Sequence, residues 1–235
     1  MMPESTHATC RVVCANCRKQ WVLDADRQVL SGPEAELFGQ RPTLREEIAR
    51  GAIRCPECDG QIALVLARPE ILLHPVIPPP LHGVAPRDIM GESWWSGVRH
   101  AAQRATDCHC AACWVPKQQA LVRPWLEGHE LYKIDWAAGR MEYQETVALC
   151  HLCHNFIHRA RLRALLDTRQ IQLTFFQQVL DHGEHVLAQA ALIGDLAKSL
   201  PPPTCAAWQD WRLVFDGNEY PPKFKTQQEW EAAYT

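Results

Sequence analysis

Short apolar runs interrupted by paired cysteines dominate the hydrophobic pattern of this chain, and helical periods are confined to a few segments. Residues 53–66, IRCPECDGQIALVL, predict a strand, a tight cysteine turn and a second strand. Residues 125–143 predict two strands around a turn at Ala138 and Gly139. Residues 146–166 predict a strand, another cysteine turn and a helix.

Three further segments carry helix signals. Thr43 opens a capping box with Glu46 three residues later. Ser93 is expected to cap the following segment, WWSGVRHAAQRA. The apolar positions of residues 171–196 recur at helical spacing, which predicts a helix, or a helical pair broken near Gly183.

These elements predict an α+β protein made of five segments. Residues 1–68 are expected to form a zinc-ribbon-like unit. Residues 69–92 contain six prolines, which predicts a semi-rigid linker or extended arm. Residues 93–170 are expected to form a second zinc-binding unit and residues 171–200 a helical segment. The aromatic-rich tail, 201–235, is expected to be a packed cap or a docking surface.

Eight of the eleven cysteines form four C-x-x-C pairs. Met1–Cys10 lacks the basic-then-apolar pattern of a secretory signal, so we expect a cytoplasmic protein whose thiols stay reduced. Such pairs then indicate zinc, because two thiolates on one tight turn reach the same tetrahedral ion. Cys10 and Cys205 are expected to be ordinary thiols, and Cys108 a spare ligand or part of a turn. The expected ligands of two structural Zn²⁺ ions are Cys14, Cys17, Cys55, Cys58 and Cys110, Cys113, Cys150, Cys153.

The composition argues against a disordered chain and against a membrane-spanning chain, and the charge distribution favours a protein that binds a polyanion. The 235 residues are 47% hydrophobic and 22% charged, so a disordered chain is not expected. No run reaches the roughly 18 apolar residues of a membrane span. The net charge is −3, yet the middle of the chain is locally basic, which favours a polyanion on one face. A solvated helix face is the alternative for the basic run 159–169. The candidate nucleic-acid contacts are Arg99, Arg104, Lys117, Arg123, Arg159, Arg161 and Arg163.

The stretch Cys110–Arg163, with CAAC, LEGHELYKID and VALCHLCHNFIH, resembles the HNH (His-Me finger) nuclease family. The resemblance implies a β-hairpin followed by a helix, fastened by zinc on the second cysteine set. It implies that His129 is a metal-ligand or catalytic side chain and that His158 is the last metal-binding histidine, near a Mg²⁺ or Mn²⁺ ion. His154 lies four residues before His158, so both project from one helix face, where they bind metal or are merely packed.

The sequence departs from the family pattern at two points. The family often has HH or DH on the first strand, where this chain has His129 and Glu130. Glu130 then stands at the general-base position, or His129 is the base and Glu130 faces away. The orienting asparagine is missing from YQETVALC, and Asn155 does not replace it. We therefore expect a degenerate site. His151, His182 and His185 are expected to face solvent.

Two functions follow from these features. The first is a zinc-binding DNA-recognition subunit, since zinc loops can present Arg and Lys to phosphates. The whole chain is weakly similar to the zinc-finger large-subunit-like proteins of type IV CRISPR effector complexes, which implies DNA, guide RNA and other protein subunits as partners. The alternative is an active HNH endonuclease of phage or plasmid origin that uses His129, Glu130 and His158. A zinc-stabilised interaction protein without nucleic acid is a third possibility.

Overall fold

The computed structural model describes residues 9–14, 16–17, 19–24, 28–32, 34–65, 67–202 and 204–234. The chain divides into two compact units, Met1–Ala67 and Arg68–Thr235, and each has its own buried apolar core. Both units contain a β-sheet and helices, which confirms the predicted α+β class.

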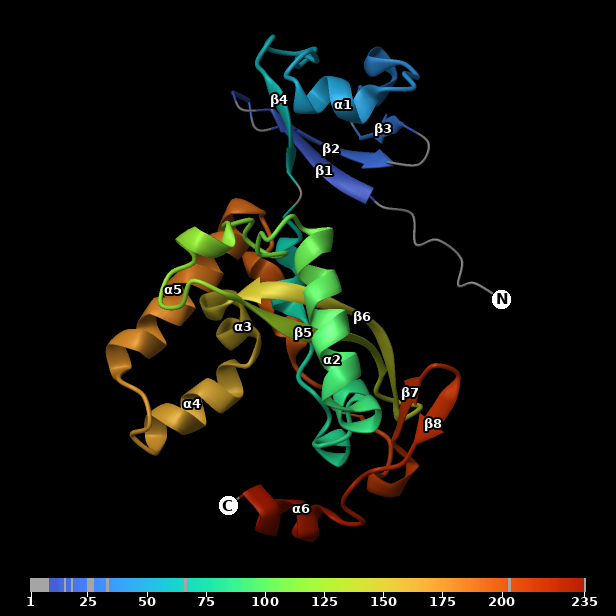
Figure 1. Ribbon diagram of the computed structural model, residues 1–235, viewed down its shortest axis with the longest axis vertical. Coiled ribbons are helices and arrows are strands. Elements are labelled where there is room, and N and C mark those ends of the chain that lie inside the picture. Colours follow the sequence, from blue (N-terminus) through green and yellow to red (C-terminus); the bar gives the residue numbers. More distant parts are fainter. Residues whose placement is uncertain are drawn as a thin grey trace. The chain divides into compact units, whose positions relative to one another are not determined.

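An antiparallel sheet with strand order β3-β2-β1-β4 forms the first unit (Figure 1). Its elements are β1 (Thr9–Cys14), β2 (Gln20–Asp24), β3 (Val29–Ser31), η1 (Ala35–Phe38), α1 (Leu44–Ala49) and β4 (Ile62–Val65). The core contains Trp21 and Phe38, whose rings meet edge to face at 5.1 Å, and Leu44 of α1. Helix α1 begins after Thr43 as predicted, but the Thr43 hydroxyl donates to Glu47 at 2.8 Å instead of pairing with Glu46.

A long hairpin is the centre of the second unit. Strands β5 (Leu126–Asp135) and β6 (Arg140–Cys150) pair antiparallel, with a register shift after Leu131, and the turn falls at the predicted Ala138 and Gly139. The sheet continues with β7 (Arg212–Phe215), parallel to β6, and β8 (Asn218–Tyr220). The aromatic tail therefore completes the sheet, and Trp211 is only 2% exposed. Figure 1 shows β7 and β8 at the end of the hairpin away from α3.

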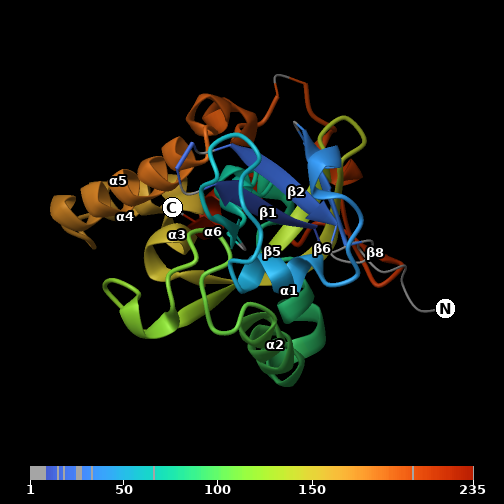
Figure 2. The same ribbon diagram turned by 90° about the horizontal axis from the view of Figure 1, so that it is seen from above.

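Helices surround this hairpin. Helix α2 runs along it, and α3, α4 and α5 group together at the cysteine end (Figures 1 and 2). Across the described parts of the chain, no helix combines the length and apolar character needed to cross a bilayer. The helices are α2 (Pro86–Ala105), α3 (His151–Ile157), α4 (Arg159–Asp167), α5 (Leu173–Gln189) and α6 (Gln227–Tyr234). The 3-10 turns are η2 (Pro69–Leu73), η3 (Pro79–Leu81), η4 (Lys117–Gln119), η5 (Ile193–Ser199) and η6 (Trp208–Asp210).

The proline-rich segment 69–92 differs from the extended linker that its composition predicts. Ile71, Leu72 and Leu81 are each 3% exposed or less and belong to the cores of the second unit. Proline fixes φ near the value that a 3-10 turn requires, so the prolines of this segment begin two packed turns. The stretch α2 begins at Pro86, but its backbone is non-helical at Gly91 (φ 78°), so the longer helix that follows begins close to the predicted cap Ser93.

Helix α5 is continuous, and Gly183 lies inside it without a break. A Cβ atom at Gly183 would lie 2.0 Å from the ring of Phe156 on α3. The glycine therefore lets two helices approach closely, which explains why a residue that disfavours helices stands in the middle of one.

Candidate metal centres

The first cysteine cluster joins Cys14, Cys17, Cys55 and Cys58, as predicted from their spacing. Antiparallel pairing of β1 with β4 brings the two turns together. The sulfur atoms of Cys14 and Cys58 lie 3.5 Å apart, and those of Cys17 and Cys55 lie 3.6 Å apart. Zinc–sulfur bonds of about 2.3 Å place tetrahedral ligands roughly 3.8 Å apart, so the cluster fits a four-thiolate ion. Burial raises the pKa of Cys14, but nearby backbone N–H groups outweigh it and lower the pKa to about 6. At Cys17 and Cys58 backbone N–H groups also lower the pKa, but burial and the neighbouring thiols outweigh them and raise it.

The second cluster joins Cys110, Cys113, Cys150 and Cys153 in the same way. Cys150 ends β6 and Cys153 lies in the first turn of α3, so the hairpin leads directly into the metal turn. The first turn is fastened to β6 by a 2.7 Å hydrogen bond from the N–H of Ala111 to the carbonyl oxygen of Ala148. The sulfur atoms of Cys113 and Cys150 lie 3.8 Å apart, which again matches a tetrahedral site.

His182 stands next to this second cluster. Its Nε2 lies 3.3 Å from the sulfur of Cys153 and 4.0 Å from that of Cys150. The prediction that His182 faces solvent is wrong, because α5 packs on α3 and turns this side chain inward. The same prediction is wrong for His151, which is 9% exposed and stacked on Phe175, and is confirmed for His185.

Three histidines form a third cluster. His129 comes from β5, His154 from α3, and His158 from the junction of α3 and α4, and their ligand nitrogens all lie within 4.8 Å of one another. His129 is 4% exposed, and its Nε2 has no hydrogen-bond partner among the described residues. Burial lowers the pKa of His129 well below its usual range and that of His158 to about 3. The rings of His129 and His158 are therefore neutral, which is the form that binds a metal, and an ion would satisfy the buried nitrogen of His129.

Glu127 forms hydrogen bonds with His154 of this cluster and with the neighbouring His151. Its Oε2 accepts a hydrogen bond from Nδ1 of His154 at 2.7 Å, and its Oε1 accepts one from Nδ1 of His151. Burial raises the pKa of Glu127, but these hydrogen bonds outweigh it and lower the pKa to about 2. Carboxylates that hold the far nitrogen of a histidine typically orient metal ligands. The sequence alone did not single out Glu127, since the carboxylate lies 27 residues before His154.

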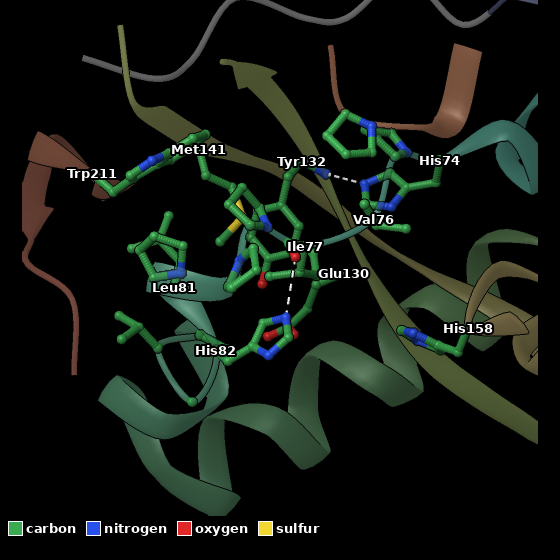
Figure 3. A pocket seen from close by; sticks show the side chains of 18 of the residues that line it. His74, Val76, Ile77, Leu81, His82, Glu130, Tyr132, Met141, His158 and Trp211 are labelled. Carbon is green, nitrogen blue, oxygen red and sulfur yellow. Dashed lines mark hydrogen bonds between the residues drawn. The ribbon is translucent and has the colours of Figure 1, made fainter. Parts of the chain in front are cut away.

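Glu130 is directed to the same region. Its carboxyl group is buried, and Oε1 accepts the backbone N–H of Arg87 at 3.3 Å while Oε2 lies 3.8 Å from the Arg87 guanidinium. Burial raises the pKa of Glu130. Glu130 and His129 both line one cavity of about 820 Å³, in which Figure 3 shows Glu130. Glu130 is not among the side chains whose ligand atoms form the histidine cluster, so which of the two residues acts as the base stays a prediction.

The predicted basic contacts separate into two groups. Arg163 forms an ion pair with Asp167 at 3.0 Å, which is the solvated-face alternative. The half-buried Arg159 packs on Phe156 and donates to the buried hydroxyl of Ser199, so its side chain is engaged within the protein. The others lie on α2, η4, the loop before β5 and α4: Arg99, Arg104, Lys117, Arg123 and Arg161.

Among the other cysteines whose side chains the structure describes, Cys108 and Cys205 join none of these clusters. Cys108 is half-buried, and Cys205 is exposed and donates to the carbonyl oxygen of Pro202. The side chain of Cys10 lies outside the described part of the structure. The structure therefore brings together two four-cysteine sets and one three-histidine set, each of which can hold a metal ion.

Comparisons of this chain with models of protein families, with curated proteins and with solved structures find no match.

Proposed function

We propose that this protein is a zinc-stabilised enzyme that hydrolyses phosphodiester bonds of nucleic acids at the cluster of His129, His154 and His158. The observation that carries the proposal is the buried, unpartnered Nε2 of His129 directed at two further histidines. Leaving a buried polar atom unsatisfied costs free energy, and a metal ion removes that cost. The carboxylate of Glu127 accepts a hydrogen bond from Nδ1 of His154, the contact that typically orients a metal-binding histidine.

The donor sets indicate which ions are bound. Four thiolates at tetrahedral spacing favour structural Zn²⁺ at both cysteine clusters. The third site offers three imidazoles, which suit Zn²⁺, Ni²⁺, Cu²⁺ or Fe²⁺, whereas Mg²⁺ and Mn²⁺ prefer oxygen ligands. We therefore propose that the histidine cluster binds Zn²⁺, Ni²⁺, Cu²⁺ or Fe²⁺, in place of the Mg²⁺ or Mn²⁺ that the family resemblance implies.

Different side chains of this protein have separate roles in the proposed hydrolysis. An ion held there would supply positive charge to the scissile phosphate and to the leaving oxygen. Water attacks phosphorus, and the bond to the leaving oxygen breaks. Glu130 accepts the proton from that water, since its carboxyl group follows His129 in β5 and lines the same cavity. Glu127 keeps Nε2 of His154 available by accepting the proton-bearing Nδ1.

Cleavage assays test this function. Purified protein is incubated with supercoiled plasmid, single-stranded DNA or RNA, with Zn²⁺, Ni²⁺, Mn²⁺ and Mg²⁺ added separately. We expect cleavage that is lost in His129→Ala and His158→Ala, falls at least roughly 100-fold in Glu130→Gln, and is unchanged in His185→Ala, an exposed histidine on α5. Absence of cleavage with every ion and substrate, or equal cleavage by the His129 and His185 variants, contradicts the proposal.

A recognition subunit without catalysis is the second candidate. It is favoured by the contacts of Arg87 with both carboxyl oxygens of Glu130, which occupy the group that would serve as the base. Exposed Arg104 and Arg123 offer phosphate contacts. Salt-sensitive binding of labelled DNA without cleavage supports this candidate. The type IV CRISPR-like complex, guide RNA and protein subunits remain predictions from the sequence.

A further inference from the structure

We propose that the cavity beside the histidine cluster binds one unpaired nucleotide of a nucleic-acid strand, with its phosphate at the histidines and its base among the aromatic side chains. The proposal rests on the proposed function, because it names the substrate class of the same site. It goes beyond that function, because a phosphodiesterase that acts on an intact duplex needs no interior pocket for a base.

The cavity has one polar end and one aromatic end. Figure 3 shows His158 at one end, Met141 and Trp211 at the other, and Glu130 and Tyr132 between them. All of the residues that line it belong to the second unit, and they include the segment 74–85 and residues of the C-terminal tail 201–235. Its volume of about 820 Å³ lies within the range of roughly 300–1,000 Å³ that ligand pockets usually have.

The polar end suits a phosphate. Arg87 and Arg161 line the cavity together with His129, His154 and His158, and both arginine side chains reach solvent. Arg161 projects from the helix that follows His158, so a positive charge lies beside the cluster. An anionic group bound by the histidine site is therefore flanked by two guanidinium groups.

The aromatic end suits a base. Trp136, Trp208 and Trp230 line the cavity and are only half-buried, so part of each indole remains accessible. Base–aromatic stacking is favourable for every base, since each has a π-face. The lining thus predicts stacking without strong sequence preference.

Hydrogen bonds hold two of these indoles, those of Trp208 and Trp230, in place before any ligand arrives. Nε1 of Trp230 donates to Nδ1 of His82 at 3.1 Å, and Nε2 of His82 lies 3.1 Å from the carbonyl oxygen of Ile77 (Figure 3). These two contacts require a proton on Nε2 of His82. Nε1 of Trp208 donates to the carbonyl oxygen of Phe224 at 2.8 Å. A pocket with fixed rings loses little conformational freedom on binding, which favours affinity.

The strand must present this base outside a duplex. A base that is stacked and paired in a duplex cannot stack on side chains that line a cavity, so it is either extruded or already single-stranded. We therefore expect single strands to bind in preference to duplexes of the same sequence.

Fluorescence anisotropy tests the pocket with the zinc-loaded full chain. The probes are a fluorescein-labelled thymidine 12-mer, the same 12-mer paired with its complement, and an abasic 12-mer with equal charge. We expect the thymidine strand to bind about tenfold more tightly than the other two. Trp208→Ala should remove that preference, and Trp125→Ala, an exposed tryptophan outside the cavity, should keep it.

A second variant covers the case in which Trp208→Ala disturbs folding. Cys205 is exposed at the cavity wall, so Cys205→Trp fills space without removing a core contact, and it should weaken the thymidine strand but not the abasic one. Equal affinity of the wild type for thymidine and abasic strands overturns the proposal. If no ion supports cleavage while the base preference persists, the proposed hydrolysis fails and the pocket stands.

Discussion

Nδ1 of His154 donates a hydrogen bond of 2.7 Å to Oε2 of Glu127, and this contact links the start of β5, at the open end of the hairpin, to helix α3. Because Nδ1 holds the proton, Nε2 of His154 is free to face His129 and His158. The same carboxylate also accepts a hydrogen bond from His151, so one half-buried charge orients two rings.

Replacing Glu127 by glutamine should therefore weaken metal binding at the histidine cluster. We expect the affinity for Zn²⁺ at the third site to fall about 10–100-fold, because the ligand loses its orienting charge. Competition with a chromophoric chelator measures the third metal equivalent separately from the two cysteine sites. Glu142→Gln, an exposed carboxylate on β6, is the matched control, and equal losses in both variants would contradict the role of Glu127.

His182 offers a similar test at the second cysteine cluster. Its N–H can donate to the sulfur of Cys153 at 3.3 Å and so stabilise a thiolate that shares its charge with the ion. We expect His182→Ala to release the zinc of this cluster about tenfold faster in a chelator-driven assay. His185→Ala, three residues later on the exposed face of α5, should release it at the wild-type rate.

Gly183 and Gly97 should respond in opposite ways to the same substitution. Gly183→Ala places a methyl group against Phe156 and should lower the free energy of unfolding by about 1–3 kcal/mol or more. Gly97→Ala meets no atom within 4 Å on α2 and should raise it by roughly 0.5–1 kcal/mol, since alanine favours helix. Urea unfolding followed by circular dichroism measures both, and a neutral Gly183→Ala would refute the close helix contact.

Removal of zinc should unfold the first unit. Its core is small, and the cysteine cluster supplies folding free energy that so few buried side chains cannot. Stringent chelation should abolish its strand signal, and elemental analysis should find at least two zinc atoms per chain. Cys14→Ser and Cys110→Ser should each lower the count by one. Fewer than two zinc atoms, or a fold that survives chelation, would contradict the account of both cysteine clusters.

Both cysteine clusters could be predicted from sequence, because a C-x-x-C turn fixes two ligands locally and four such turns pair in only a few ways. The hairpin turn at Ala138 and Gly139 and the helix start after Thr43 were also predictable, since backbone preferences there depend on adjacent residues. The packing of the proline-rich segment 69–92 could not be predicted. Its proline content indicates a stiff backbone, but it does not show that Ile71 and Leu72 are buried in a core.

The sequence by itself determined the α+β class, the eight clustered cysteines and the pairing of His154 with His158 on one face, since each follows from spacing along a short segment. Only the tertiary structure decided that His129 completes their cluster, that Glu127 orients it and that His182 reaches the thiolates. Those contacts join residues more than 20 positions apart. Their formation depends on how whole elements pack, which local periodicity does not encode.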